Sequence, residues 1–240
     1  MISPVVTKKI IHPSLSRWTE IACVLVFALL AGCGGGGSDS GGSTPAAPAA
    51  VFDLAAAQDN IYNNSRFNLT GDDNLGGHYT ASMIFTNQGT QTVNGIDATH
   101  ITLDLSLTET NSNAVVAGTQ DLYFEADYVP VLQVSNPDNI QYMPTSVVAI
   151  PSSASVGDSG AMATYALSTG EIEVDTWSLD PGVNGRATLT FHVTIRDATN
   201  AITDQETYAF TIDEAGTVYA LALTLNDSSG LVLTLSGNKQ

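Results

Sequence analysis

The sequence predicts an all-β protein, built as an antiparallel β-sandwich or a partly open β-barrel of about eleven short strands. Apolar and polar residues alternate with a period of two through most of residues 51–240. Clusters of Gly, Asn, Asp and Pro interrupt this alternation at short intervals. Only one stretch, residues 52–62, is compatible with helical periodicity, and a short helix and an extended leading segment fit it nearly equally well.

Two segments, residues 100–108 and 186–196, carry the alternation most regularly. Both are rich in β-branched and aromatic residues, which pleated sheets prefer. In the second segment five apolar residues share one face, and Thr, His and Arg occupy the other. The apolar residues are Ala187, Leu189, Phe191, Val193 and Ile195. Each segment therefore predicts a half-buried strand.

Turn-forming clusters near residues 197–200, 213–216 and 226–230 divide the C-terminal part into hairpins. They predict a four-stranded antiparallel meander with strands at 186–196, 201–212, 217–225 and 230–236. The remaining strands are expected at 78–86, 100–109, 119–127, 129–135, 145–150, 161–168 and 171–179.

The first 32 residues have the layout of an export signal. Lys8, Lys9 and Arg17 precede an apolar run, and small residues follow it. The apolar run from residue 21 to residue 32 is shorter than the roughly 18 to 20 residues that a membrane-spanning helix needs. Residues 1–32 are therefore expected to be a signal peptide rather than a permanent membrane span.

The end of this signal, Leu30-Ala31-Gly32-Cys33, closely resembles the lipobox of bacterial lipoproteins. The resemblance implies that Cys33 becomes the first mature residue and is diacylated on sulfur, then acylated, for example with palmitate, on its amine. Several acyl chains anchor a protein stably, whereas one binds reversibly. Gly34, rather than Asp, follows the cysteine, which by the same resemblance favours the cell outer membrane. An ordinary secretory signal is the alternative.

Residues 33–50 consist mostly of Gly, Ser, Ala and Pro and predict a flexible tether. Residues 51–240 are long enough for one domain with a sizeable core. This domain contains no cysteine, so neither a disulfide nor a thiolate site is expected. Removing the signal leaves four basic residues against 23 acidic ones, a formal charge of −19. Such a charge repels nucleic acid.

The tetrapeptide Gly157-Asp158-Ser159-Gly160 resembles the surroundings of the nucleophile in trypsin-like proteases. The resemblance is four residues long, and the family pattern does not continue into Ala161. The surroundings of the family's histidine are also missing. The segment is interpreted as a turn that leads into a strand, with glycines free to adopt positive φ. A serine hydrolase that uses Ser159 is the enzymatic alternative.

The mature domain also resembles a loosely defined group of uncharacterised bacterial envelope lipoproteins. The resemblance is carried by "FDLAAAQDNIY", by "FNLTGDDNLGGHYTASMIF" and by "IPSSASVGDSGAMATYALSTG". It implies an envelope location and a structural role for the turn at residues 157–160, and it implies no activity.

Two groups of oxygen ligands are the candidates for a cation site. Glu171, Glu173 and Asp175 share one strand face with Trp177, with successive carboxylates about 6.5 to 7 Å apart. One strand offers too few of the six to eight oxygens that Ca²⁺ requires, so a solvated acidic face is expected instead. Asp72, Asp73 and Asn74 form the other group, but Met83 stands where an EF-hand loop has Glu. No metal, cofactor or catalytic residue is therefore predicted.

These observations predict a lipid-anchored envelope protein without enzymatic activity. The leading hypothesis is an interaction module for an envelope protein or glycan, with no nucleic acid partner. The alternative is a protein that binds a small apolar ligand or a cation, as β-barrel carriers do. An outer-membrane barrel would alternate similarly, but the runs are uneven and an acyl anchor would be redundant.

Overall fold

The structure is a computed structural model that describes residues 50–240. The predicted signal peptide at residues 1–32, Cys33 and the tether up to residue 49 lie outside the described residues. Within the described part, no helix is long and apolar enough to cross a membrane.

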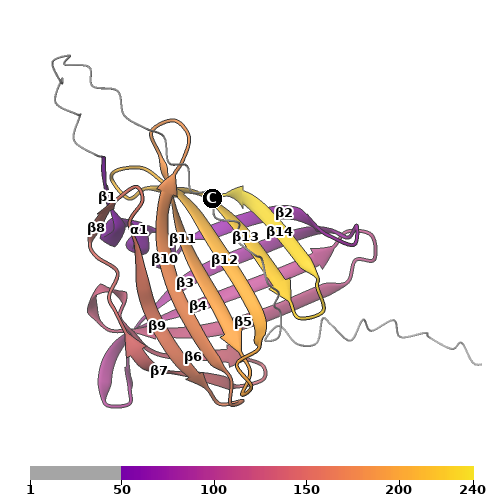
Figure 1. Cartoon of the computed structure of the whole chain (residues 1–240), viewed down its shortest axis with the longest axis horizontal. Helices are drawn as coiled ribbons and strands as arrows, with labels where there is room; N and C mark the ends of the chain where they lie inside the picture. The colour runs from indigo at the N-terminus through magenta and orange to yellow at the C-terminus, as the bar shows by residue number, and fades with distance from the viewer. Residues whose placement is uncertain (1–49) are drawn as a thin grey trace, which may run out of the picture.

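Fourteen strands and one α-helix make up the fold (Figure 1). In chain order these elements are β1 (Val51–Asp53), α1 (Leu54–Tyr62), β2 (Arg66–Asp73), β3 (His78–Val93), β4 (Ile96–Glu109), β5 (Val115–Phe124), β6 (Pro130–Asn136), β7 (Ile140–Val147), β8 (Ser153–Ser155), β9 (Ser159–Leu167), β10 (Ile172–Pro181), β11 (Ala187–Arg196), β12 (Ile202–Ile212), β13 (Val218–Asp227) and β14 (Val232–Asn238). A short 3-10 turn at Ala126–Tyr128 joins β5 to β6.

Twelve of the strands close into an antiparallel barrel, and each is hydrogen-bonded to two neighbours (Figure 1). The order around the ring is β2 to β7, then β9 to β14, and β14 pairs with β2 to complete it. β8 leaves the ring and pairs with β1 in a separate two-stranded sheet. The all-β prediction is confirmed. Of the two architectures expected from the sequence, the barrel is correct, and it is closed rather than partly open.

The expected meander is present as β11 to β14, with bounds close to those predicted. Four strands were not predicted where they occur, and two of them are the short β1 and β8, which pair with each other outside the ring. β2 lies outside the expected strands, and it ends in Gly71, Asp72 and Asp73, all poor strand formers. β7 begins at Ile140 rather than at residue 145, and Pro144 interrupts its alternation. The hairpin of β3 and β4 is also longer than expected, because its polar tip continues the pairing to Val93 and Ile96.

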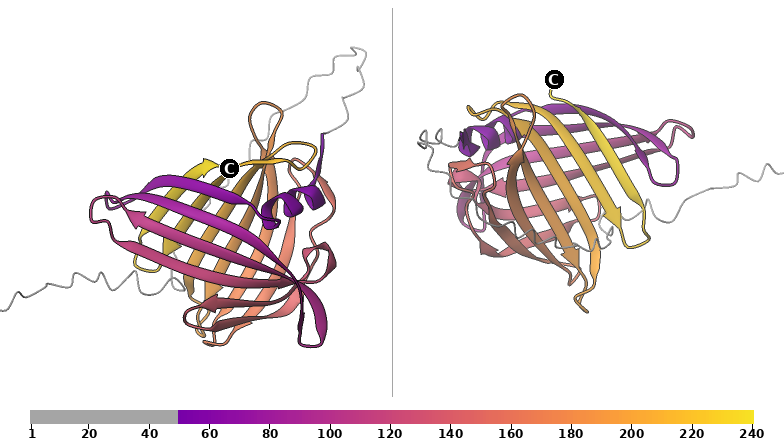
Figure 2. Two further views of the ribbon diagram at one scale, coloured as in Figure 1. Left: turned by 180° about the vertical axis from the view of Figure 1, so that it is seen from behind. Right: turned by 45° about the horizontal axis from the view of Figure 1, so that its top comes forward.

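The helix α1 lies across one end of the barrel (Figure 2). The side chain of Asp53 caps it by accepting a hydrogen bond of 2.9 Å from the amide of Ala56. Its buried residues are spaced i, i+3, i+4 and i+7, which places them on one face of a helix. These residues are Leu54, Ala57, Gln58 and Ile61. Residues 52–62 thus form the short helix that was one of the two expectations.

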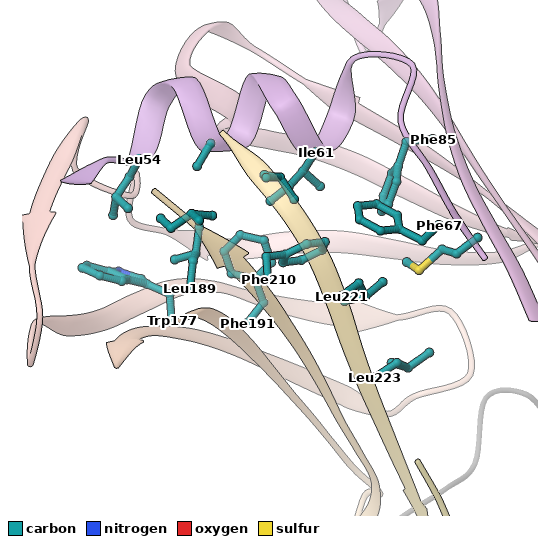
Figure 3. Close-up of a cluster of buried hydrophobic side chains, with 14 of the residues drawn as sticks. Leu54, Ile61, Phe67, Phe85, Trp177, Leu189, Phe191, Phe210, Leu221 and Leu223 are labelled. Carbon is teal, nitrogen blue, oxygen red and sulfur yellow. The ribbon is translucent and has the colours of Figure 1, made fainter. Parts of the chain in front are cut away.

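The hydrophobic core lies beneath α1 (Figure 3). Leu54 and Ile61 point from the helix toward aromatic and aliphatic side chains that project inward from the barrel wall. Phe210 is the centre of this cluster, with ring centroids 5.8 Å from Phe67 and 5.7 Å from Phe191. The helix and these aromatic residues therefore close one end of the barrel, which we call the helix end.

The opposite end, which we call the far end, carries the turns between β2 and β3, β4 and β5, β6 and β7, β9 and β10, β11 and β12, and β13 and β14. Both ends of the described chain lie at the helix end, since Val51 precedes α1 and Lys239 donates a hydrogen bond to the carbonyl of Asn60. All strands of the ring, the helix and the core belong to residues 51–240. This segment thus contains the interactions that it needs to fold on its own.

The seam between β2 and β14 closes the ring and depends on glycine. A Cβ atom on Gly71 would lie 1.8 Å from the carbonyl oxygen of Thr234, and one on Gly237 would lie 1.9 Å from that of Asn68. Both neighbours are backbone atoms, so no side chain can move away to make room. The two strands can approach each other this closely only without side chains at these positions.

We expect Gly71→Ala to destabilise the domain, because the seam must separate to admit the methyl group. The cost should be about 1–3 kcal/mol or more, as for other overpacked sites. Gly118→Ala in β5 is the control, because a Cβ there would meet nothing closer than the carbonyl of Asn136 at 3.8 Å. Urea denaturation of residues 50–240 measures both changes. Equal free energies of unfolding for the two variants would contradict the role of the seam.

Candidate functional site

The barrel encloses a lumen with a volume of about 390 Å³. This is within the size range of pockets that hold small organic ligands. Most of the lining is apolar and comes from α1 and from strands on both sides of the ring. Ile61, Phe85, Leu105, Phe124, Phe191 and Phe210 are among these apolar residues.

The lumen reaches the surface at two places, where exposed residues belong to its lining. Ala117, Pro137 and Asp138 lie at the far end, beside the start of β5 and the turn between β6 and β7. Val148 and Ala149 lie after β7, on the side of the helix end. At the far end β5 extends beyond β6, because their pairing begins only at Thr119 and Asn136.

Carboxyl groups line one side of this apolar lumen. Glu173 and Asp175 project into it from β10, and Glu206 projects from β12 together with Tyr208. The strand register places Asp175 and Glu206 at the same level, on either side of Val193 in β11. Glu173 and Asp175 do share a face with Trp177, as the alternation indicates, but this face is the inside of the barrel.

The expectation of a solvated acidic face is therefore wrong for Glu173 and Asp175. Glu173 is 5% exposed and Asp175 is 8% exposed. Glu171 lies outside β10, in the turn at the far end, where its carboxylate accepts a hydrogen bond from Thr169. The physical reason is closure of the ring, because a closed sheet has one solvated face only, and β10 continues from the carboxyls into Trp177 and Leu179, which belong to the core.

The polar groups of the lumen are only partly satisfied. Tyr208 donates a hydrogen bond to Glu206, and the Gln120 amide donates one of 2.8 Å to Gln133. Oδ1 of Asp175, in contrast, is buried and has no hydrogen-bond partner among the described residues. Leaving a buried polar atom unpaired costs free energy.

Burial shifts the protonation of these carboxyls toward the neutral form. Burial raises the pKa of Asp175 to about 8, and the nearby Glu206 adds to this shift. Burial also raises the pKa of Glu206, although the Tyr208 hydroxyl acts in the opposite direction. The pKa of Glu173 is raised well above its ordinary value, first by burial and then by the other carboxyls. Burial therefore favours the neutral, protonated form of these carboxyls.

The described lining of the lumen contains acidic side chains but no basic ones. Among residues 50–240, no Lys, Arg or His belongs to the lining. The four basic residues of this segment lie elsewhere. Arg186 stacks on the ring of Tyr219, Arg196 donates to the carbonyl of Asn200, and Lys239 donates to that of Asn60. Arg66 is exposed at the start of β2.

The second acidic group, Asp72, Asp73 and Asn74, stabilises the turn between β2 and β3. The carboxylate of Asp73 accepts hydrogen bonds from the amides of Leu75 and Gly77 and from the Tyr79 hydroxyl. Burial alone would raise the pKa of Asp73, but these hydrogen bonds more than offset it and the pKa lies below its ordinary value.

Neighbouring groups also engage the other two members of this acidic turn. Asp72 contacts His78 at 2.5 Å, and Asn74 joins the turn to β14 through Gly230 and Val232. Nowhere in the described segment do three His, Cys, Asp or Glu residues come together in a group that could hold a metal ion. The turn at residues 72–74 and the carboxyls of β10 therefore do not converge on one site.

The segment Gly157-Asp158-Ser159-Gly160 forms the predicted turn into β9. Gly157 has a φ of +99°, and the Asp158 carboxylate accepts a hydrogen bond of 2.8 Å from the amide of Ser155. Ser159 is exposed and pairs with Ser178 of β10. It is Ser178 that contacts His192, at 3.3 Å, and donates to Asp180. A triad instead requires the histidine on the nucleophilic serine and the aspartate on that histidine.

Sequence reasoning missed Glu206 and Tyr208, although a signal for them was present. In the stretch "ITDQETYAFTI" they alternate in phase with Phe210 and Ile212, which occupy the core. A carboxyl that alternates in phase with core residues on the same strand is expected to face the interior. Gln120 and Gln133 follow the same rule on β5 and β6, where they alternate in phase with Leu122 and Val131.

Comparison with known proteins does not assign a role to this lumen. No protein-family model, no curated protein and no solved structure matches the chain. The function therefore has to be inferred from the lumen itself, from its volume, its apolar lining and its carboxyl groups.

We expect the stability of the domain to fall as the pH rises from about 5 to about 9, and Asp175→Asn to reduce this fall. The pKa of Asp175 is about 8 in the folded state against an ordinary value of 3.8. The protonated carboxyl thus stabilises the fold fully below pH 3.8, and this stability is lost as the pH rises toward about 8. The difference should be a few kcal/mol, since one pKa unit corresponds to about 1.4 kcal/mol.

Urea denaturation at pH 5 and pH 9 measures this effect. Asp180→Asn is the matched control, because it makes the same change at an exposed position on the same strand, β10. If the free energy of unfolding falls between pH 5 and pH 9 as steeply for Asp175→Asn as for the control, Asp175 is not buried in its neutral form.

Proposed function

We propose that the protein binds a small, largely apolar ligand inside its barrel and is held at the bacterial cell envelope by an acylated Cys33. The observation that carries the proposal is the lumen, an apolar cavity of about 390 Å³ that reaches the surface beside exposed lining residues. A few polar groups on an otherwise apolar wall are the usual composition of a small-molecule site. Apolar burial supplies affinity, and the polar groups select the ligand.

The structure favours this function over the interaction module that leads the sequence-based hypotheses. All twelve strands of the ring are paired on both sides, so none offers a free edge for a partner to extend. The lumen, in contrast, is a feature that a purely structural module does not require. Binding is proposed as the role of the domain and no chemical reaction is assigned to it.

The position of the chain termini agrees with an anchored binding protein. Val51, where the folded domain begins, lies at the helix end, and a tether to Cys33 would leave from there. The opening beside Ala117 and Pro137 lies at the far end. An anchor at Cys33 would therefore leave this opening free for a ligand.

We expect residues 50–240 to bind the uncharged apolar dye N-phenyl-1-naphthylamine, with a saturable rise in fluorescence. Gly118→Trp should reduce binding at least tenfold, since Gly118 lines the lumen close to its far-end opening. The backbone there tolerates a side chain, because a Cβ would meet only the Asn136 carbonyl, at 3.8 Å.

Ala222→Trp is the control for this experiment. Ala222 is exposed on β13 between Leu221 and Leu223, which point inward, so a tryptophan there adds the same bulk to the outer wall. The control should bind the dye as the unmodified domain does. Dye binding that neither substitution changes, or the absence of dye binding, would contradict a ligand site in the lumen.

The anchor is tested separately, in cells. If acylation of Cys33 holds the protein at the membrane, Cys33→Ala should move it from the membrane fraction to the soluble fraction. Fractionation followed by immunodetection of a C-terminal tag measures the change. A Cys33→Ala chain that stays in the membrane fraction would contradict a lipid anchor at this residue.

A further inference from the structure

The carboxyl side of the lumen has no counterpart of opposite charge. Glu173 and Asp175 on β10 and Glu206 on β12 face an interior whose lining, within the described residues, contains no Lys, Arg or His. An anionic ligand such as a fatty acid would place a further negative charge among these groups. Burying a charge without a partner of opposite sign is strongly unfavourable. The lumen is therefore unsuited to anions.

Asp175 provides a second, independent observation that points to a ligand with a hydrogen-bond donor. The residue is 8% exposed, lines the lumen, and leaves Oδ1 without a hydrogen bond. A ligand that donates a hydrogen bond to this atom would remove the cost of leaving it unpaired. A donor with a positive charge would add the attraction of opposite charges in a medium of low dielectric constant.

A metal ion does not fit these carboxyls. No group of three His, Cys, Asp or Glu in the described segment is arranged to hold one. Asp175 and Glu206 lie at one level of the barrel with the strand β11 between them. Such spacing suits a group that carries several donors and lies between the two acids. An ammonium group has up to three donors and no acceptor.

We propose that the lumen binds a protonated amine carried on an apolar body, with its ammonium group held by Asp175 and Glu206. This inference rests on the proposed ligand-binding function and specifies its ligand class. The apolar body would lie toward α1, among Phe85, Phe124 and Phe210. Glu173, on the same face of β10 as Asp175, adds to the negative potential around the ammonium group.

Binding of an amine should depend on pH through the groups that face this site. The lining carboxyls are Glu173 and Asp175 on β10, Glu206 on β12 and Asp138 in the turn between β6 and β7, and the buried Asp204 on β12 and Asp227 on β13 lie near the far end. The tyrosines are Tyr62 on α1, Tyr128 in the turn between β5 and β6, Tyr142 on β7, Tyr165 on β9 and Tyr208 on β12. Burial raises the pKa of each of these five tyrosines, so they stay neutral in the relevant range.

β11 separates the two acids. The residues of β11 that line the lumen do not titrate, and they are Phe191, Val193 and Ile195. The carboxyls are therefore the groups that respond to pH. Because the pKa of Asp175 is raised to about 8, an amine must displace its proton at neutral pH. Amine affinity should thus rise between pH 5.5 and pH 8, while an alkylamine itself stays protonated.

Three ligands with the same twelve-carbon chain test the proposal by displacing N-phenyl-1-naphthylamine from residues 50–240. These are dodecylamine, dodecanol and dodecanoate, each titrated over the same range of low micromolar concentrations. We expect dodecylamine to displace the dye at a concentration at least tenfold lower than dodecanol at pH 8, with dodecanoate the weakest. The preference for the amine over the alcohol should shrink at pH 5.5.

The double variant Asp175→Asn with Glu206→Gln should still bind the dye, and its preference for dodecylamine over dodecanol should fall to less than about threefold. The control, Asp97→Asn with Asp180→Asn, removes the same charge from two exposed positions and should keep the preference. The measurement in 0.5 M NaCl screens attraction to the acidic surface, so a preference that comes from the lumen should persist there.

The outcomes separate the two proposals. No dye binding, or dye binding that Gly118→Trp leaves unchanged, would overturn the proposed function itself. Dye binding that Gly118→Trp abolishes, with equal displacement by the three ligands or strongest displacement by dodecanoate, would leave the function standing and overturn the amine. An amine preference that survives in Asp175→Asn with Glu206→Gln would also overturn it. The pH dependence in the unmodified domain tests the inference without any variant.

Discussion

Closure of the sheet is the constraint on which the rest of this structure depends. Once β14 pairs with β2, every second side chain of twelve strands must point into a common interior. Barrels of about eight strands can fill such an interior with side chains, whereas wider barrels leave space. Here α1 and the aromatic cluster around Phe210 fill the helix end, and a lumen remains beyond them. The cavity is thus a consequence of strand number and of a helix that closes one end only.

The same constraint explains the unusual position of the carboxyls. On an open sheet, Glu173, Asp175 and Glu206 could face water, but in a closed ring their strand phase commits them to the interior. Their burial opposes ionisation, and the five residues paired with them on the neighbouring strands offer no charge to compensate it. These residues are Ala163, Tyr165, Val193, Ile195 and Leu225. An interior of this kind reduces stability, and a ligand of opposite charge would restore it.

Much of the fold could be predicted from the sequence, because strand alternation and turn chemistry are local properties. The meander β11 to β14 and the turn at Gly157 follow from them, whereas the helix at residues 54–62 was one of two open alternatives. Ring closure could not be predicted, because it depends on contacts between β2 and β14, which are far apart in the chain. Gly71 and Gly237 allow the close approach of β2 and β14, but this requirement becomes visible only when the two strands lie side by side.

The candidate site was predicted in part and misinterpreted. The alternation placed Glu173, Asp175 and Trp177 together correctly, but it does not reveal which face of a strand is buried. The neighbouring residues carried that information, since Leu179 continues the same face into the core. Asp72 and Asp73 show the opposite case, because their carboxylates serve a turn whose hydrogen bonds only the structure reveals.

The most direct test of a charged-ligand lumen is a crystal structure of residues 50–240 grown with dodecylamine at pH 8. The account predicts the alkyl chain inside the barrel, beneath α1, and the amine nitrogen within hydrogen-bonding distance of Oδ1 of Asp175 and of the Glu206 carboxylate. An amine bound only to the outer wall, or a lumen filled by the protein's own side chains, would contradict it.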